Sequence, residues 1–201
     1  TVKKYETCIL RKGVEISQFQ SFIACMADAF SDTPISIAEM KDIIIASLTL
    51  DSYITLHNGN LISIFYDESL KVDINQYVDS NFYKNIDFNN EKNVYTLNKV
   101  VKSFENFKNF LAMDDIIIDH TYLWDIVTTP NDKLFKMGFN LIILESGDDI
   151  TNNINVLCPT NYYSNQTFDT KKSTMFLYKS NEYYEPIYTY TDNDRIVNVG
   201  K

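Results

Sequence analysis

The 201-residue sequence is poor in the residue types on which many functional sites depend. It contains five glycines, three cysteines, two histidines and one tryptophan. Five scattered glycines exclude a glycine-rich phosphate-binding loop. The histidines and cysteines show no metal-ligand spacing, so we predict neither a metal site nor a bound cofactor.

The cysteines also fit no disulfide framework, because Cys8, Cys25 and Cys158 are odd in number and widely spaced. The sequence has no secretory signal and no apolar run of about 18 residues, so we predict no membrane span. A reducing compartment, the cytoplasm, is the location that this pattern favours. Because the sequence starts at Thr1 rather than at Met, we expect a piece of a longer protein.

Positive charge is scarce: the net charge is −9, and the only arginines are Arg11 and Arg195. This balance argues against nucleic acid and against an anionic membrane surface as partners. A hydrophobic fraction of 45% predicts one folded domain over residues 1–201. We interpret the abundance of isoleucine, asparagine and lysine as the codon bias of an AT-rich microbe or of a large DNA virus.

The central feature of the sequence is a polar loop that enters an apolar helix, over residues 14–30. Apolar residues recur there at helical spacing, which predicts one buried stripe. Either Ser17 or Ser21 can cap this helix. The stripe consists of Phe22, Ile23, Met26, Ala29 and Phe30.

Further helices are expected in the first two thirds of the chain. Ser36 and Glu39 form a capping-box pattern, which predicts a helix over residues 36–48. Residues 53–66 fit either a hairpin around Asn58-Gly59 or two helices with a glycine break. The remaining helical predictions are 74–82, 97–111 and a short helix over 124–135 broken at Pro130.

Strands are expected mainly in the C-terminal half, with one more near the start. They cover residues 7–10, 139–144, 154–158, 173–178 and 184–190. The continuous apolar run of 139–144, entered through Gly138, is typical of a sheet centre. The predicted fold is α+β: helices first, then an antiparallel meander, with the 22–30 helix packed on a mostly antiparallel sheet.

Three segments stand in a recognisable order. Gln18-Phe19-Gln20-Ser21 precedes the central helix, Trp124 precedes the apolar strand, and Tyr183-Tyr184-Glu185-Pro186 opens a late strand. This order resembles papain-like deubiquitinases of the OTU (ovarian tumour) type. Their landmarks are a cysteine at a helix start, a tryptophan-containing segment and a His-Tyr-x-Pro-like step. The resemblance implies a papain-like fold and suits a protein of a large DNA virus.

The resemblance places Ser21 at the nucleophile position and Tyr183 at the position of the catalytic base. Serine is a weaker nucleophile than cysteine, and tyrosine titrates near pH ~10. The resemblance therefore implies a catalytically inactive pseudo-deubiquitinase in the host cytoplasm or the virion. Such a domain would serve as a protein-interaction module, with a ubiquitin-like or another viral protein as its partner.

Two alternatives stay open. Ser21 can be a plain helix cap. Cys25 can be the nucleophile of an active cysteine protease or deubiquitinase, with Gln18 or Gln20 as oxyanion donor and His120 as base. The helical periodicity opposes this second alternative, because it places Cys25 one turn inside the apolar helix, where a thiol is a small buried hydrophobe.

Overall fold

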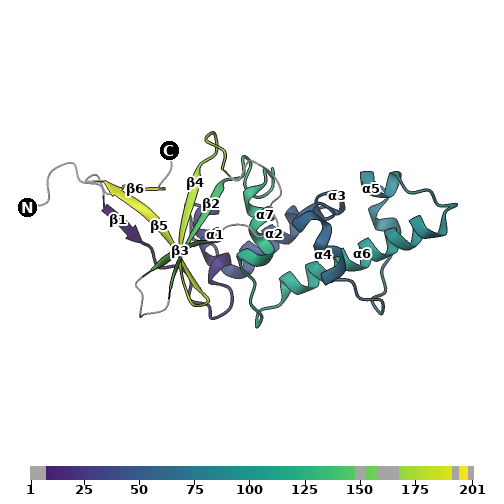
Figure 1. Cartoon of the computed structure of the whole chain (residues 1–201), viewed down its shortest axis with the longest axis horizontal. Coiled ribbons are helices and arrows are strands. Elements are labelled where there is room, and N and C mark those ends of the chain that lie inside the picture. The colour runs from purple at the N-terminus through teal and green to yellow at the C-terminus, as the bar shows by residue number, and fades with distance from the viewer. Residues whose placement is uncertain (1–7, 148–152, 158–167, 192–194, 199–201) are drawn as a thin grey trace, which may run out of the picture. The chain divides into compact units, whose positions relative to one another are not determined.

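The computed structural model describes residues 8–147, 153–157, 168–191 and 195–198 (Figure 1). The chain divides into two compact units. The first unit contains residues 1–43 and 114–201, and the second contains residues 44–113. The single domain expected from the sequence stays a prediction.

The first unit holds every described strand and the helix on which the sequence prediction centred (Figure 1). Its strands are β1 (Cys8–Arg11), β2 (Asn140–Ser146), β3 (Ile154–Leu157), β4 (Thr174–Ser180), β5 (Tyr183–Thr191) and β6 (Arg195–Asn198). Its helices are α1 (Ser21–Phe30), the first part of α2 (Ile37–Ser47), and α7 (His120–Thr128). The predicted strand positions are confirmed within the described residues, and Thr7 and Cys158, each at an end of a predicted strand, lie outside them.

The described strands form one mixed sheet in the order β1-β5-β4-β2-β3, with β6 also paired to β5. Four of the five pairings are antiparallel, which confirms an α+β fold with a mostly antiparallel sheet. The predicted meander is wrong, because β2 and β4 pair in parallel. The chain reaches β3 at the outer edge of the sheet and then crosses back to the other side of β2.

The helix α1 is more deeply buried than a single apolar stripe requires. All seven residues from Ser21 to Ala27 are buried. Phe22 packs edge-on against Tyr184 of β5, with ring centroids 5.3 Å apart. Since the first seven residues of α1 are buried and Phe22 packs against β5, the prediction that the 22–30 helix packs on the sheet is confirmed.

The second unit is helical and has its own aromatic core. It contains α3 (Leu50–Tyr53), η1 (Leu56–Gly59), α4 (Asn60–Ile64), η2 (Ile74–Tyr77), α5 (Asn81–Lys84) and α6 (Glu91–Ala112). The apolar face predicted for 97–111 is confirmed, because Val100, Val101, Phe104, Phe107 and Leu111 are all buried. Phe107 lies 5.5 Å from Tyr53 and 4.9 Å from Phe65, between ring centroids.

Two local predictions need correction. The hairpin alternative for 53–66 is wrong, since these residues form α3, η1 and α4. The helix expected over 124–135 begins earlier, at His120, where Asp119 accepts from the backbone N–H of Thr121 at 2.8 Å, and it ends at Thr128. The predicted capping box at the start of α2 is confirmed, with Ser36 N–H to Glu39 Oε2 at 2.7 Å.

Candidate functional site

The entry to α1 is held by side-chain contacts to the backbone. Ser17 Oγ accepts from the N–H groups of Phe19 and Gln20, at 3.3 and 3.0 Å. The buried Gln20 amide donates to the carbonyl of Ile116 at 3.3 Å. These contacts fix the loop in front of α1, where the OTU resemblance places a nucleophile and where the Cys25 alternative places its oxyanion donor.

Ser21 lies at this point but does not cap the helix. Gln20 occupies the N-cap position, without a side-chain capping bond. Instead, Ser21 Oγ donates to the carbonyl of Glu182 at 3.2 Å and accepts from the N–H of Tyr184 at 3.0 Å. Ser21 is 1% exposed. The prediction that Ser21 caps the helix is therefore wrong, and the Ser21 hydroxyl ties α1 to the start of β5.

Tyr183 lies between Glu182 and Tyr184, the two backbone partners of Ser21. The fold therefore brings Ser21 and the backbone of Tyr183 close together in space. The described hydrogen bonds of Ser21 go to the backbone on either side, and none joins it to the Tyr183 phenol. Burial, followed by the nearby Glu185 and Cys25, raises the pKa of Tyr183 above its ordinary value. A phenol with a raised pKa stays protonated at neutral pH and cannot take a proton from a nucleophile.

A second polar cluster lies beside this contact and centres on Tyr184. The Tyr184 hydroxyl donates to Asp119 Oδ2 at 3.1 Å and lies 2.7 Å from His120 Nδ1. With Nδ1 protonated, His120 donates to the same phenol oxygen. Tyr184 is 1% exposed, and its pKa is raised well above the ordinary value, first by burial and then by Asp119. The Tyr184 hydroxyl therefore joins β5 to the start of α7.

Within the described ranges, no hydrogen bond joins the alternative pair, Cys25 and His120. Cys25 is fully buried, and burial, followed by the charges of Asp28 and Glu185, raises its thiol pKa well above the ordinary value. A buried thiol with a raised pKa is a poor nucleophile. His120 instead contacts Tyr184, Asp119 and the rings of Phe22 and Trp124.

Sequence reasoning named His120 and Tyr183 but missed Asp119 and Tyr184, which carry the polar contacts. Two local patterns in the sequence could have identified Tyr184 and Asp119. Tyr184 and Tyr188 share one face of β5 by the two-residue alternation of a strand, and both are buried. Asp119 directly precedes a helix, which is the position of an N-cap carboxylate.

Asp119 makes the free energy of unfolding decrease as the pH falls into the acidic range. Burial alone would raise its pKa, but hydrogen bonds from His120 and from the N–H of Thr121 outweigh burial and hold the pKa at about 2. An unfolded aspartate titrates near ~3.9, so the stabilisation is complete above about pH 5 and is lost as pH falls towards about 2. We expect Asp119→Asn, which keeps the cap, to remove up to about 2 kcal/mol of this dependence, measured by urea unfolding across that range.

The matched control is Asp73→Asn, at an exposed N-cap that accepts from the N–H of Asn75 at 2.9 Å. It removes the same charge from a capping position without a buried partner. An acid limb that is unchanged in Asp119→Asn, or reduced equally in Asp73→Asn, would contradict the assignment.

The described residues offer neither a metal-binding cluster nor a membrane-spanning helix. Among the described residues, no group of three or more His, Cys, Asp or Glu side chains could hold a metal ion. None of the helices in the described ranges combines the length and apolar character needed to cross a membrane.

No family model, no curated protein and no solved structure matches this chain. The resemblance to OTU-type deubiquitinases therefore rests on its sequence landmarks alone.

Proposed function

We propose that this chain is a catalytically inactive, OTU-like interaction module of a viral protein, located in the host cytoplasm or the virion. The observation that carries the proposal is the state of Ser21. At the position that the resemblance assigns to the nucleophile, the chain has a buried hydroxyl that donates to one β5-side backbone group and accepts from another. A hydroxyl held in this way cannot attack a substrate carbonyl.

The tyrosine-rich strand supports a binding role. Tyr178, Tyr183 and Ile187 alternate with the buried residues of β4 and β5 and are only half-buried. Arg11 reaches across this face, 4.6 Å from the ring centroid of Tyr178, and pairs with Glu185 at 3.1 Å. Tyrosine and arginine side chains are enriched where proteins bind one another. A protein partner, ubiquitin-like or viral, is the occupant that we propose for this module.

The test is reaction with a ubiquitin-derived electrophilic probe, followed by mass spectrometry of the intact protein. We expect no adduct and no cleavage of ubiquitin chains above background, because the buried Ser21 presents no nucleophile. Ser21→Cys should also stay unlabelled, since Tyr183 cannot accept the thiol proton. The double variant Ser21→Cys with Tyr183→His is the sharper form of the same experiment.

The competing function makes the opposite forecast. An active cysteine protease built on Cys25 and His120 would label in its unmodified form, and Cys25→Ala would abolish the adduct. The matched control is Cys8→Ala, because Cys8 is exposed. An adduct at Cys25 that depends on His120 would overturn the proposal. An adduct confined to Cys8 would be ordinary alkylation and would leave Ser21 and Cys25 unreactive as expected.

A further inference from the structure

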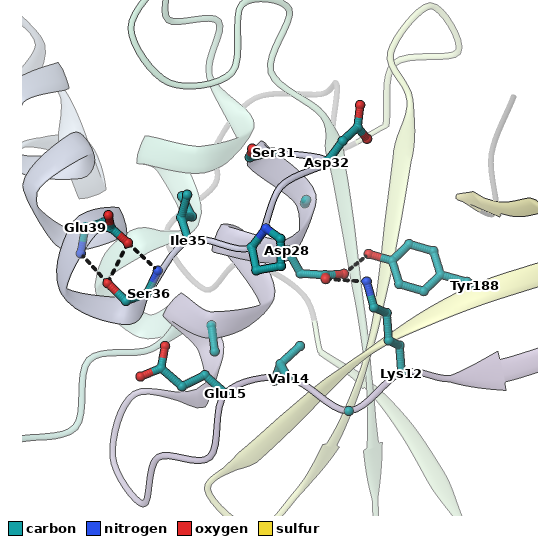
Figure 2. A pocket seen from close by; sticks show the side chains of 14 residues that line it. Lys12, Val14, Glu15, Asp28, Ser31, Asp32, Ile35, Ser36, Glu39 and Tyr188 are labelled. Carbon is teal, nitrogen blue, oxygen red and sulfur yellow. Dashed lines mark hydrogen bonds and ion pairs between the residues drawn. The ribbon is translucent and has the colours of Figure 1, made fainter.

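The first unit carries an open cleft whose lining does not include Ser21 (Figure 2). Its walls are the loop after β1, the second half of α1, the connection to α2, and Tyr188 of β5. Its volume is about 760 Å³. Pockets of roughly 300–1,000 Å³ are of the size that holds a small ligand or a few side chains of a partner.

The lining of the cleft is strongly unbalanced in charge. It contains the carboxylates of Glu15, Asp28, Asp32 and Glu39 but only one ammonium group, that of Lys12. Glu39 accepts from Ser36, and these hydrogen bonds lower its pKa, so it remains ionised at neutral pH. A cleft lined by one sign of charge attracts ligands of the opposite sign.

One part of the cleft already holds a cation. Lys12 Nζ donates to Asp28 Oδ1 at 2.5 Å and lies 5.7 Å from the ring centroid of Tyr188. The Tyr188 hydroxyl donates to the other carboxylate oxygen, Oδ2, also at 2.5 Å. In Figure 2, the Asp28 side chain extends from α1 towards both groups. Carboxylate and aromatic ring together form a cation subsite that Lys12 fills from within the chain.

Lys12 is a replaceable occupant of this subsite. Its side chain is 43% exposed, whereas that of Asp28 is 19% exposed. It belongs to the loop after β1, directly before Gly13, where an added Cβ would meet no atom within 4 Å. An ion pair with a half-exposed partner contributes little to stability, so an incoming cation can displace it readily.

We propose that the cleft binds an arginine side chain of a partner protein, with the guanidinium group replacing Lys12 at Asp28. A guanidinium group is planar, donates two parallel hydrogen bonds to a carboxylate and stacks on an aromatic ring. An ammonium group can neither donate two parallel hydrogen bonds in this geometry nor stack as a planar group on the ring. The inference rests on the proposed role in protein binding, but it concerns other residues than Ser21 and Tyr183.

The test is titration of the full chain, labelled with ¹⁵N, with the capped peptide Gly-Arg-Gly and with its citrulline counterpart. Citrulline has nearly the shape of arginine but no charge. We expect the arginine peptide alone to shift the amide signals of Lys12, Asp28 and Tyr188, with smaller shifts at higher salt. Lys12→Ala should tighten binding about two- to fivefold, because it removes the internal competitor. Asp28→Asn should abolish the shifts.

Lys71→Ala is the matched control: it removes the same charge from an exposed lysine outside the cleft, and we expect no tightening. The inference is overturned if neither peptide shifts these signals, if citrulline shifts them equally, or if Lys12→Ala weakens binding. Because Lys12 is exposed, its replacement keeps the test valid even if Asp28→Asn impairs folding. An adduct of the ubiquitin probe at Ser21 or Cys25 would refute the proposed function alone, whereas absent peptide shifts would refute this inference alone.

Discussion

Replacement of Gly138 by alanine is expected to lower the free energy of unfolding by about 2–5 kcal/mol. Gly138 has φ +60°, and a Cβ at this position would lie 2.1 Å from the carbonyl oxygen of Thr128 and 2.9 Å from its carbon. The left-handed conformation alone costs an alanine about 1–2 kcal/mol, and forcing an atom into occupied space adds about 1–3 kcal/mol. Both contacts are with backbone, which cannot rotate away. Urea unfolding followed by circular dichroism measures the loss.

Gly13→Ala is the matched control, because nothing lies within 4 Å of the Cβ it would add. We expect a change of less than about 1 kcal/mol, of either sign, since this substitution mainly restricts the unfolded chain. If both variants unfold at the same urea concentration, the close approach of Gly138 to Thr128 is not a feature of the folded protein in solution.

The sequence predicted the strand that follows Gly138 but not its neighbours. An apolar run entered through a glycine indicates a central strand, and β2 does lie between β4 and β3. The alternation of side chains along β2 and β4 is the same for a parallel and an antiparallel pairing. The direction of β4 depends on where the chain after β3 returns, which no local pattern encodes.

For residues 53–66 the alternative of two helices with a glycine break is confirmed, and the hairpin alternative is wrong. Asn58-Gly59 indicates positive φ, and the structure has φ values of 49°, 55° and 81° at His57, Asn58 and Gly59. Such a dipeptide suits a hairpin turn as well as a break between helices. What decides between them is the burial of Leu56, Leu61 and Phe65, which face the aromatic core of the second unit. That core is formed by residues distant in the sequence, so no pattern within residues 53–66 reveals it.

At the candidate site, the sequence predicted the elements better than the side chains. The resemblance to OTU enzymes brought the start of α1 and the start of β5 into one site, and the hydrogen bonds of Ser21 join these two elements. It chose Tyr183, although the neighbouring Tyr184 carries the buried contacts. Successive strand residues point to opposite faces, so a step of one position along β5 exchanges a buried side chain for a half-exposed one.

Tyr184→Ala is expected to be the most destabilising substitution at this site, by about 3–5 kcal/mol, as for other large aromatic residues removed from a core. Tyr184 is 1% exposed, packs edge-on against Phe22, and bonds through its hydroxyl to Asp119 and His120. Its removal leaves a cavity beside α1 and takes away a donor from a buried carboxylate. Tyr184→Phe isolates the second effect, and we expect about 1–3 kcal/mol for it.

Tyr183→Ala is the control for this pair, since it deletes a tyrosine from the same strand but from the half-exposed face. We expect a loss of about 1 kcal/mol or less. Urea unfolding of the three variants ranks them, and the order Tyr184→Ala, Tyr184→Phe, Tyr183→Ala follows from the direction in which each side chain points. A larger loss for Tyr183→Ala than for Tyr184→Ala would mean that Tyr183 faces α1. Ser21 would then lie beside the phenol side chain of Tyr183 rather than beside backbone. The polar contacts assigned here to Tyr184 would have to be assigned to Tyr183.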